Sequence, residues 1–174
     1  MNWSSKDERE AYEINGFIEH YKRLPEGRDF VVLEKREKPD YFVTDRTSRE
    51  NFGVELTSAY LSDSSVPNEH LKTLNGKLEN IPFNREEIEH FKMRLLEAVK
   101  VKVNKAILSY DLRYPLILSI YVNEYRSIFM DRKEWERFIK ENEAKFDAMH
   151  PFKQIFFWSL VNGDALLVTP NNPV

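Results

Sequence analysis

Two carboxylates stand where β-strands are expected, in the stretch KPDYFVTDRTSRENFGVELT at residues 38–57. Asp40 precedes one apolar run, and Glu55 lies inside another. A carboxylate among Val, Leu and Tyr loses its hydration, so the placement is favourable only where a partner compensates the charge. A divalent metal ion held by oxygen ligands is the simplest such partner. The two acids therefore predict a metal site, and with it hydrolytic chemistry.

The spacing of the two acids indicates that they face each other. If residues 40–44 and 53–57 pair as a hairpin with a turn at 47–48, the numbers of opposed residues sum to about 95. Asp40 then lies opposite Glu55, with Cβ atoms about 4.5–5.5 Å apart. A slip of one residue in this register would separate the pair.

Side chains that alternate along a strand place Glu55 and Thr57 on one face, and Val54 and Leu56 on the other. Two carboxylates this close repel each other, and the pKa of one rises unless a cation lies between them. Mg²⁺ suits the site because it binds one or two carboxylates and keeps several waters. The alternative is that Glu55 lies on a solvated strand face and Asp40 merely begins a strand.

The surrounding elements follow from periodicity and turn signals. Apolar spacing predicts helices over 6–24, 84–109 and 131–145; the second begins at an Asn84 cap and the third at a capping box formed by Asp131 and Glu134. Short apolar runs predict strands at 30–34, 41–43, 52–60, 116–122, 154–161 and 164–169, with a loop at 62–69 and a hairpin turn at Asn162-Gly163. This order predicts an α/β fold: a mixed central β-sheet flanked by helices.

Composition limits the class of protein. A chain of 174 residues with 41% hydrophobic and 32% charged residues predicts a single domain over 1–174. No apolar run is long enough to span a membrane, and the N-terminus is too polar for a signal peptide. The absence of cysteine excludes disulfides and thiolate metal sites, and it favours a cytoplasmic location. Because the net charge is −3, nucleic-acid binding would require a local basic surface.

The residues Pro39-Asp40, a strand–turn–strand and Gly53-Val54-Glu55-Leu56-Thr57 together resemble the core of the PD-(D/E)XK nuclease superfamily, which includes restriction endonucleases and repair nucleases. The resemblance covers about residues 8–122, where the predicted order matches the α-β-β-β-α-β core of that superfamily. It implies a restriction-endonuclease-like domain with an added C-terminal helix and hairpin at about 131–169. It also implies a Mg- or Mn-dependent endonuclease that hydrolyses phosphodiester bonds, in DNA rather than RNA.

The same resemblance implies a role for particular residues. Asp40 and Glu55 match the two metal-binding acids, joined by the backbone carbonyl of Leu56. The first helix of the family often supplies a further acid, and the E-x-x-x-F-[LI] spacing selects Glu13 for it. Glu10 and Glu19 are alternative candidates on the same helix. A glutamate on a helix is also commonly solvated, with no role in a site.

The chain departs from the family pattern at Thr57, where a lysine is expected. Some relatives with E-x-T carry that lysine on the following helix, and the spacing to the next strand selects Lys102 here. Lys102 lies about 60° round the helix from Val99, at the edge of the buried stripe. Lys105 lies about twice as far round, and Lys92 is also near the stripe. The alternative is that Lys102 merely extends into solvent.

Other residues give weaker indications of a function. Arg46, Arg49 and Arg85 are candidates for phosphate contact, and the four histidines have no close metal-ligand spacing. An aromatic set is expected in the core: Trp135, Phe138, Phe146, Phe156, Phe157 and Trp158. A homodimer is compatible with the sequence. Two other functions stay open: a catalytically inactive nuclease-like binding or regulatory module, and a dimerisation module whose acidic pair is incidental.

Overall fold

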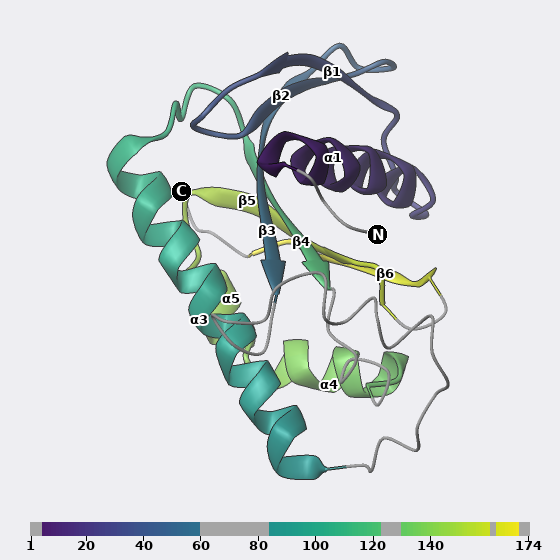
Figure 1. Ribbon diagram of the computed structural model, residues 1–174, viewed down its shortest axis with the longest axis vertical. Coiled ribbons are helices and arrows are strands. Elements are labelled where there is room, and N and C mark those ends of the chain that lie inside the picture. Colours follow the sequence, from purple (N-terminus) through teal and green to yellow (C-terminus); the bar gives the residue numbers. More distant parts are fainter. Residues whose placement is uncertain (1–4, 60–83, 123–129, 161–162, 171–174) are drawn as a thin grey trace.

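The computed structural model describes residues 5–59, 84–122, 130–160 and 163–170, which form one mixed sheet with helices on both faces (Figure 1). The described elements, in chain order, are α1 (Lys6–Lys22), β1 (Phe30–Lys35), β2 (Tyr41–Asp45), β3 (Asn51–Ala59), α3 (Arg85–Ser109), β4 (Leu116–Val122), α4 (Arg132–Glu141), α5 (Glu143–Asp147), β5 (Phe152–Trp158) and β6 (Ala165–Val168). The predicted mixed α/β architecture is confirmed. The loop expected at 62–69 and Asn162 of the expected hairpin turn lie outside the described residues.

The six strands lie in the order β1-β2-β3-β4-β5-β6. Pairing is antiparallel for β1 with β2, β2 with β3, and β5 with β6, whereas β3, β4 and β5 run parallel. Parallel neighbours need a long connection, and α3 lies in the chain between β3 and β4. The sheet therefore carries an antiparallel hairpin beside a parallel centre, and β3 is the strand where the two patterns meet.

Each face of the sheet has its own hydrophobic core. On one face α1 packs its Ile14, Phe17 and Tyr21 against strand residues that include Val54 and Leu56. On the other face the helices α3, α4 and α5 bury a larger cluster against β4 and β5. Figure 1 shows α1 and α3 running on different sides of β3. The central strand β4 is buried on both faces, as parallel strands in α/β proteins are.

Side-chain caps begin the helices where the sequence places them. The Asn84 side chain accepts a hydrogen bond from the Glu86 backbone N–H at the start of α3, and Asp131 accepts one from Glu134 at the start of α4. The expected aromatic core is confirmed, because all six of its side chains are at most 2% exposed. Within the described ranges, no helix combines the length and apolar character that crossing a membrane requires.

The helix predicted from residue 131 to 145 is wrong in one respect, because it is two helices. At Asn142 the backbone leaves the helical conformation, with φ −113° and ψ 15°. The Asn142 side chain donates to the carbonyl of Phe138, and its own carbonyl accepts from the N–H groups of Lys145 and Phe146. Asparagine favours such local side-chain bonds over continued helix, and the break lets Phe146 pack against the ring of Phe138.

Candidate active site

The β2–β3 hairpin has the register that brings the two predicted acids together. Tyr41 lies opposite Val54, so their numbers sum to 95. Asp40 immediately precedes β2 and continues this register, which places it opposite Glu55. The hairpin turn falls between Asp45 and Glu50, where the backbone N–H of Asp45 donates to the carbonyl of Glu50. The spacing of the sequence thus predicted the pairing correctly.

Gly53 is necessary for the position of Asp40. A Cβ atom at Gly53 would lie 2.7 Å from Cγ of Pro39 and 2.6 Å from Cδ2 of Leu116. Real Cβ atoms do not approach other atoms so closely, so only glycine lets Pro39 pack directly against β3. The proline in turn precedes Asp40. The P-D and G-x-E segments of the sequence are therefore parts of one packing arrangement.

The site forms at the part of β3 that extends beyond its pairing with β2. Since β2 begins at Tyr41, the backbone of β3 beyond Val54 has no strand partner on that side. The carboxylate of Asp40 accepts a hydrogen bond from the N–H of Leu56 at 2.8 Å. The Lys102 ammonium donates to the Leu56 carbonyl at 2.9 Å. The Asp40 carboxylate and the Lys102 ammonium thus satisfy the backbone N–H and C=O of Leu56, which would otherwise be unpaired at the edge of β3.

Glu55 is the most deeply buried charged residue of the site, with 0% of its surface exposed. Its Oε1 atom accepts a hydrogen bond from Nζ of Lys102 at 2.6 Å and lies 3.8 Å from Nζ of Lys105. Its Oε2 atom is buried and has no hydrogen-bond partner among the described residues. A buried carboxylate oxygen without a well-formed donor is unfavourable, so Oε2 of Glu55 can take a cation or a hydrogen bond from the neighbouring Tyr110 hydroxyl.

Tyr110, just beyond the end of α3, is a second buried group beside Glu55. Its hydroxyl lies next to the Glu55 carboxylate, although the two do not reach the geometry of a full hydrogen bond. Burial raises the pKa of Tyr110, and hydrogen bonding with the Glu55 carboxylate and the negative charge of that carboxylate raise it further. The Lys105 ammonium lies 5.8 Å from the centre of the Tyr110 ring. The environment of Glu55 therefore combines two lysines with a neutral phenol.

The two acids influence each other as their spacing predicts. The pKa of Asp40 is raised from its usual 3.8 to about 6, mainly by burial and secondly by the negative charge of Glu55. The Leu56 N–H and the Lys102 ammonium oppose this rise. A single lysine thus compensates the acidic pair only in part, which leaves it suited to a further positive charge.

The α1 helix supplies acids from the other side of the pocket. Glu13 is buried, accepts a hydrogen bond from Oγ of Ser58 at 2.5 Å and lies 3.8 Å from Nε of Arg9. Burial raises the pKa of Glu13, and the Ser58 hydroxyl opposes that rise. Glu13 therefore lies at the site with a short polar contact to β3, as expected for an acid supplied by the first helix.

The two rivals of Glu13 behave differently. Glu10 lines the pocket too, but its carboxylate is already paired with Lys35 at 2.8 Å and with Lys6 at 3.3 Å. Glu19 is exposed and lies 3.9 Å from Arg23, outside the pocket lining. Of the three candidate glutamates, the structure therefore brings Glu13 and Glu10 to the pocket and leaves Glu19 on the surface.

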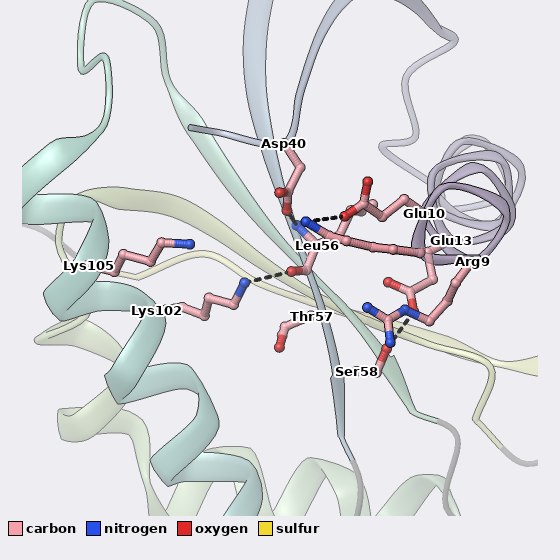
Figure 2. A pocket seen from close by; sticks show the side chains of 10 residues that line it. Arg9, Glu10, Glu13, Asp40, Leu56, Thr57, Ser58, Lys102 and Lys105 are labelled. Atoms are coloured by element: carbon pink, nitrogen blue, oxygen red, sulfur yellow. Dashed lines mark hydrogen bonds and ion pairs between the residues drawn. The ribbon is translucent and has the colours of Figure 1, made fainter. Parts of the chain in front are cut away.

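An open pocket of about 210 Å³ connects these groups. Figure 2 shows Lys102 and Lys105 reaching in from α3 on one side, with Arg9, Glu10 and Glu13 on α1 on the other and Asp40 between them. The complete lining is Lys6, Arg9, Glu10, Glu13, Asp40, Leu56, Thr57, Ser58, Lys102 and Lys105. Four of these side chains are cationic and three are carboxylates, so the pocket gathers positive charge beside acids on a chain of net charge −3.

The three arginines proposed for phosphate contact lie elsewhere. Arg46 and Arg49 flank the hairpin turn, at the far end of β2 from Asp40. Arg85 begins α3, about 25 Å along the helix axis from Lys102. None of the three lines the pocket, so they are not part of this site. The cations that do line it from α1, Lys6 and Arg9, were missed, although each precedes a candidate glutamate by four residues and so shares its helix face.

The oxygen atoms present fit a divalent ion of the Mg²⁺ type. Asp40, Glu55 and the Leu56 carbonyl supply oxygen ligands only, and Mg²⁺ commonly takes one or two carboxylates while keeping its waters. The Oε2 atom of Glu55 is a further oxygen that could bind the ion. Among the described residues, however, no group of three or more His, Cys, Asp or Glu side chains is arranged to hold a metal ion. Any ion would therefore be held by few protein ligands and several waters.

Comparisons of the chain with models of protein families, with curated proteins and with solved structures find no match. A functional interpretation consequently depends on the site itself. Its chemical content is a pair of close carboxylates, one of them fully buried, beside a lysine that contacts both Glu55 and the Leu56 carbonyl. Such a group can bind a cation and can place a positive charge next to an anionic substrate.

Proposed function

We propose that the protein is a divalent-metal-dependent nuclease that hydrolyses phosphodiester bonds, with DNA as the favoured substrate. The observation that carries the proposal is the convergence of Asp40, Glu55 and Lys102. They come from the residue before β2, from β3 and from α3. Asp40 and Lys102 line one pocket, and the fully buried Glu55 accepts a hydrogen bond from Lys102 there. The burial of Glu55 in an apolar sheet has no structural benefit of its own, which favours a chemical role.

Each residue has a definite part in this proposal. Asp40 and Glu55 hold the ion, together with the carbonyl of Leu56. When bound, Mg²⁺ or Mn²⁺ supplies a bound water of lowered pKa and neutralises charge on the scissile phosphate. Lys102 places a positive charge where the attacking water and the transition state need it, as the motif lysine of PD-(D/E)XK nucleases would. Glu13, held by Ser58, orients a water on the α1 side.

The form of the pocket supports a polyanionic substrate. Lys105 on α3 and both Lys6 and Arg9 on α1 place cations on opposite sides of Asp40. A strand that crosses the pocket would therefore meet positive charge before and after the scissile phosphate, although the chain as a whole is acidic. This arrangement favours a nucleic acid over a small phosphate ester, which would contact one side only.

A catalytically inactive nuclease-like binding module is the second candidate, and one observation favours it. Lys102 already donates to both Glu55 and the Leu56 carbonyl, so the buried charge is compensated in part without an ion. Such a protein would keep the cationic pocket and bind nucleic acid without cleaving it. Cleavage separates the two candidates.

The test is a cleavage assay on linear DNA, supercoiled DNA and RNA with Mg²⁺, Mn²⁺ or EDTA. Wild type is compared with Glu55→Gln, which keeps the size of the side chain and removes its charge. We expect cleavage that needs the ion and falls at least about 100-fold in Glu55→Gln. Glu134→Gln is the matched control, because Glu134 also pairs with a lysine of α3 but lies outside the pocket lining.

The outcomes discriminate clearly. Cleavage that survives EDTA or the Glu55→Gln change would contradict the proposed metal site. Equal losses in Glu55→Gln and Glu134→Gln would point to damaged folding instead of lost chemistry. Metal-independent binding of DNA without any cleavage would favour the inactive binding module.

A further inference from the structure

The Lys102 ammonium occupies the position that a metal ion would need. It lies 2.6 Å from Oε1 of Glu55 and 2.9 Å from the carbonyl oxygen of Leu56. These are two of the oxygen ligands assigned to the ion. An ammonium group donates to both oxygens, whereas an ion would accept their lone pairs directly, so the two cations compete for the same electrons.

The surroundings make this competition specific to one lysine. Lys105 also approaches Oε1 of Glu55, but at 3.8 Å and without a hydrogen bond to it. Its side chain is 46% exposed, compared with 21% for Lys102. Lys105 therefore acts on Glu55 through its charge alone, while Lys102 acts through its charge and by occupying the ligand atoms.

Glu55 makes the competition unavoidable. The carboxylate is 0% exposed, so water cannot stabilise it when a partner leaves. One positive charge must remain close to it at every stage. Lys102 can leave only when another cation arrives, and an arriving ion can bind both oxygens only when Lys102 leaves. The exchange of one for the other keeps the buried charge compensated throughout.

We propose that Lys102 is an internal competitor of the divalent ion: the ion displaces its ammonium from Glu55 and Leu56, and this displacement delivers the ammonium to the substrate. The inference rests on the proposed nuclease function and adds a mode of regulation to it. The pocket contains the space for the move, since Lys102 lines it together with Asp40 and Thr57. The protein without metal thus holds the Lys102 ammonium on Glu55 and on the carbonyl of Leu56.

The test is the affinity of Mg²⁺ and Mn²⁺, measured by titration calorimetry without nucleic acid. Wild type is compared with Lys102→Met and with Lys105→Met. Both variants remove one positive charge close to Glu55, but only Lys102→Met frees the ligand atoms. We expect at least about tenfold tighter binding in Lys102→Met, as loss of a competing charge-assisted hydrogen bond implies. Lys105→Met should change the affinity by no more than about threefold.

Each outcome decides the matter. Tighter binding in Lys102→Met than in Lys105→Met supports displacement. Equal gains in the two variants would reduce the effect to charge alone and overturn the inference. Cleavage by wild type combined with unchanged or weaker binding in Lys102→Met would overturn it while the nuclease function stands. If wild type and both variants neither bind an ion nor cleave, the proposed function and the inference fail together.

A second measurement does not depend on how well Lys102→Met folds. The lysine ammonium signals of wild-type protein are recorded by ¹⁵N-resolved NMR, with Lys102→Arg used to assign Lys102. We expect its signal to shift and to exchange faster with water when Mg²⁺ is added, because its hydrogen bonds to Glu55 and Leu56 are lost. A Lys102 signal unchanged at saturating Mg²⁺ would overturn the displacement.

Discussion

Two lysines of the same helix, Lys92 and Lys102, form ion pairs of the same length with opposite burial. Lys92 Nζ lies 2.6 Å from Glu134 and 2.8 Å from Glu89, and its side chain is 8% exposed while those of the acids are 26% and 56% exposed. At Lys102 the lysine is the more exposed partner, with 21% against 0% for Glu55. One pair buries its base, and the other buries its acid.

The difference separates a structural link from a site. The carboxylates paired with Lys92 reach solvent, so water replaces their partner when they separate, and the pair mainly joins α3 to α4. Glu55 has no such alternative and needs a cation at all times. Burial of the acid therefore creates a place for a positive charge that different cations can fill. Neither the length of an ion pair nor its residue types would reveal this.

The largest expected effect is on turnover. Lys102→Met should lower the rate of DNA cleavage at least about 100-fold, because it removes a positive charge next to the reacting phosphate. Lys92→Met should leave the rate within about threefold, since Lys92 lies outside the pocket lining. Single-turnover cleavage at saturating Mg²⁺ measures both. Similar losses of cleavage rate in the two variants would contradict the assignment of Lys102 to the active site and of Lys92 to a structural ion pair.

The next effect is on stability without metal. Lys102→Met leaves the buried Glu55 with only the Lys105 ammonium at 3.8 Å, and we expect it to lower the free energy of unfolding by about 3 kcal/mol. Lys92→Met should cost about 1 kcal/mol, because its acids become solvated. Urea unfolding in EDTA measures both values. The Lys102→Met/Glu55→Gln double variant should recover part of the loss, and a double variant no more stable than Lys102→Met would contradict the account of buried charge.

The smallest effect is the pH dependence that Asp40 contributes to stability. Because the pKa of Asp40 is raised from 3.8 to about 6, the folded protein retains a proton that the unfolded chain releases between these values. Stability in EDTA should therefore fall as pH rises from about 4 to about 6, by at most about 3 kcal/mol from this group. The measurement is urea unfolding of wild type and Asp40→Asn across this range. A difference between them that does not vary with pH would contradict the raised pKa.

Much of the fold was predictable because its signals are local. The caps at Asn84 and Asp131, the strand runs and the hairpin register all follow from residues close together in the sequence. The break at Asn142 was not predicted, because it depends on a local side-chain bond that competes with an otherwise continuous helical pattern. The nuclease assignment itself stays a prediction.

The site was predictable to a lesser degree. Asp40 and Glu55 stand out in the sequence because acids interrupt apolar strands, and Lys102 stands at the edge of a helical stripe. The spacing to the next strand selected Lys102 through the family resemblance, whereas rotation about the helix axis alone separated it only weakly from Lys92 and Lys105. Arg9 is signalled only by its i,i+4 spacing to Glu13, and Tyr110 had no local signal, because its contact with Glu55 depends on how the end of α3 packs against β3.

The sequence by itself determined which charged residues lie in the sheet. It also determined the register in which β2 and β3 pair, because hairpin pairing depends on spacing along a short stretch of chain. The tertiary structure alone decided which lysine meets Glu55. That choice depends on how α3 crosses the face of the sheet between β3 and β4, which brings residues 55 and 102 within 2.6 Å of each other. Contacts over such separations arise from packing of whole elements, and no local pattern records them.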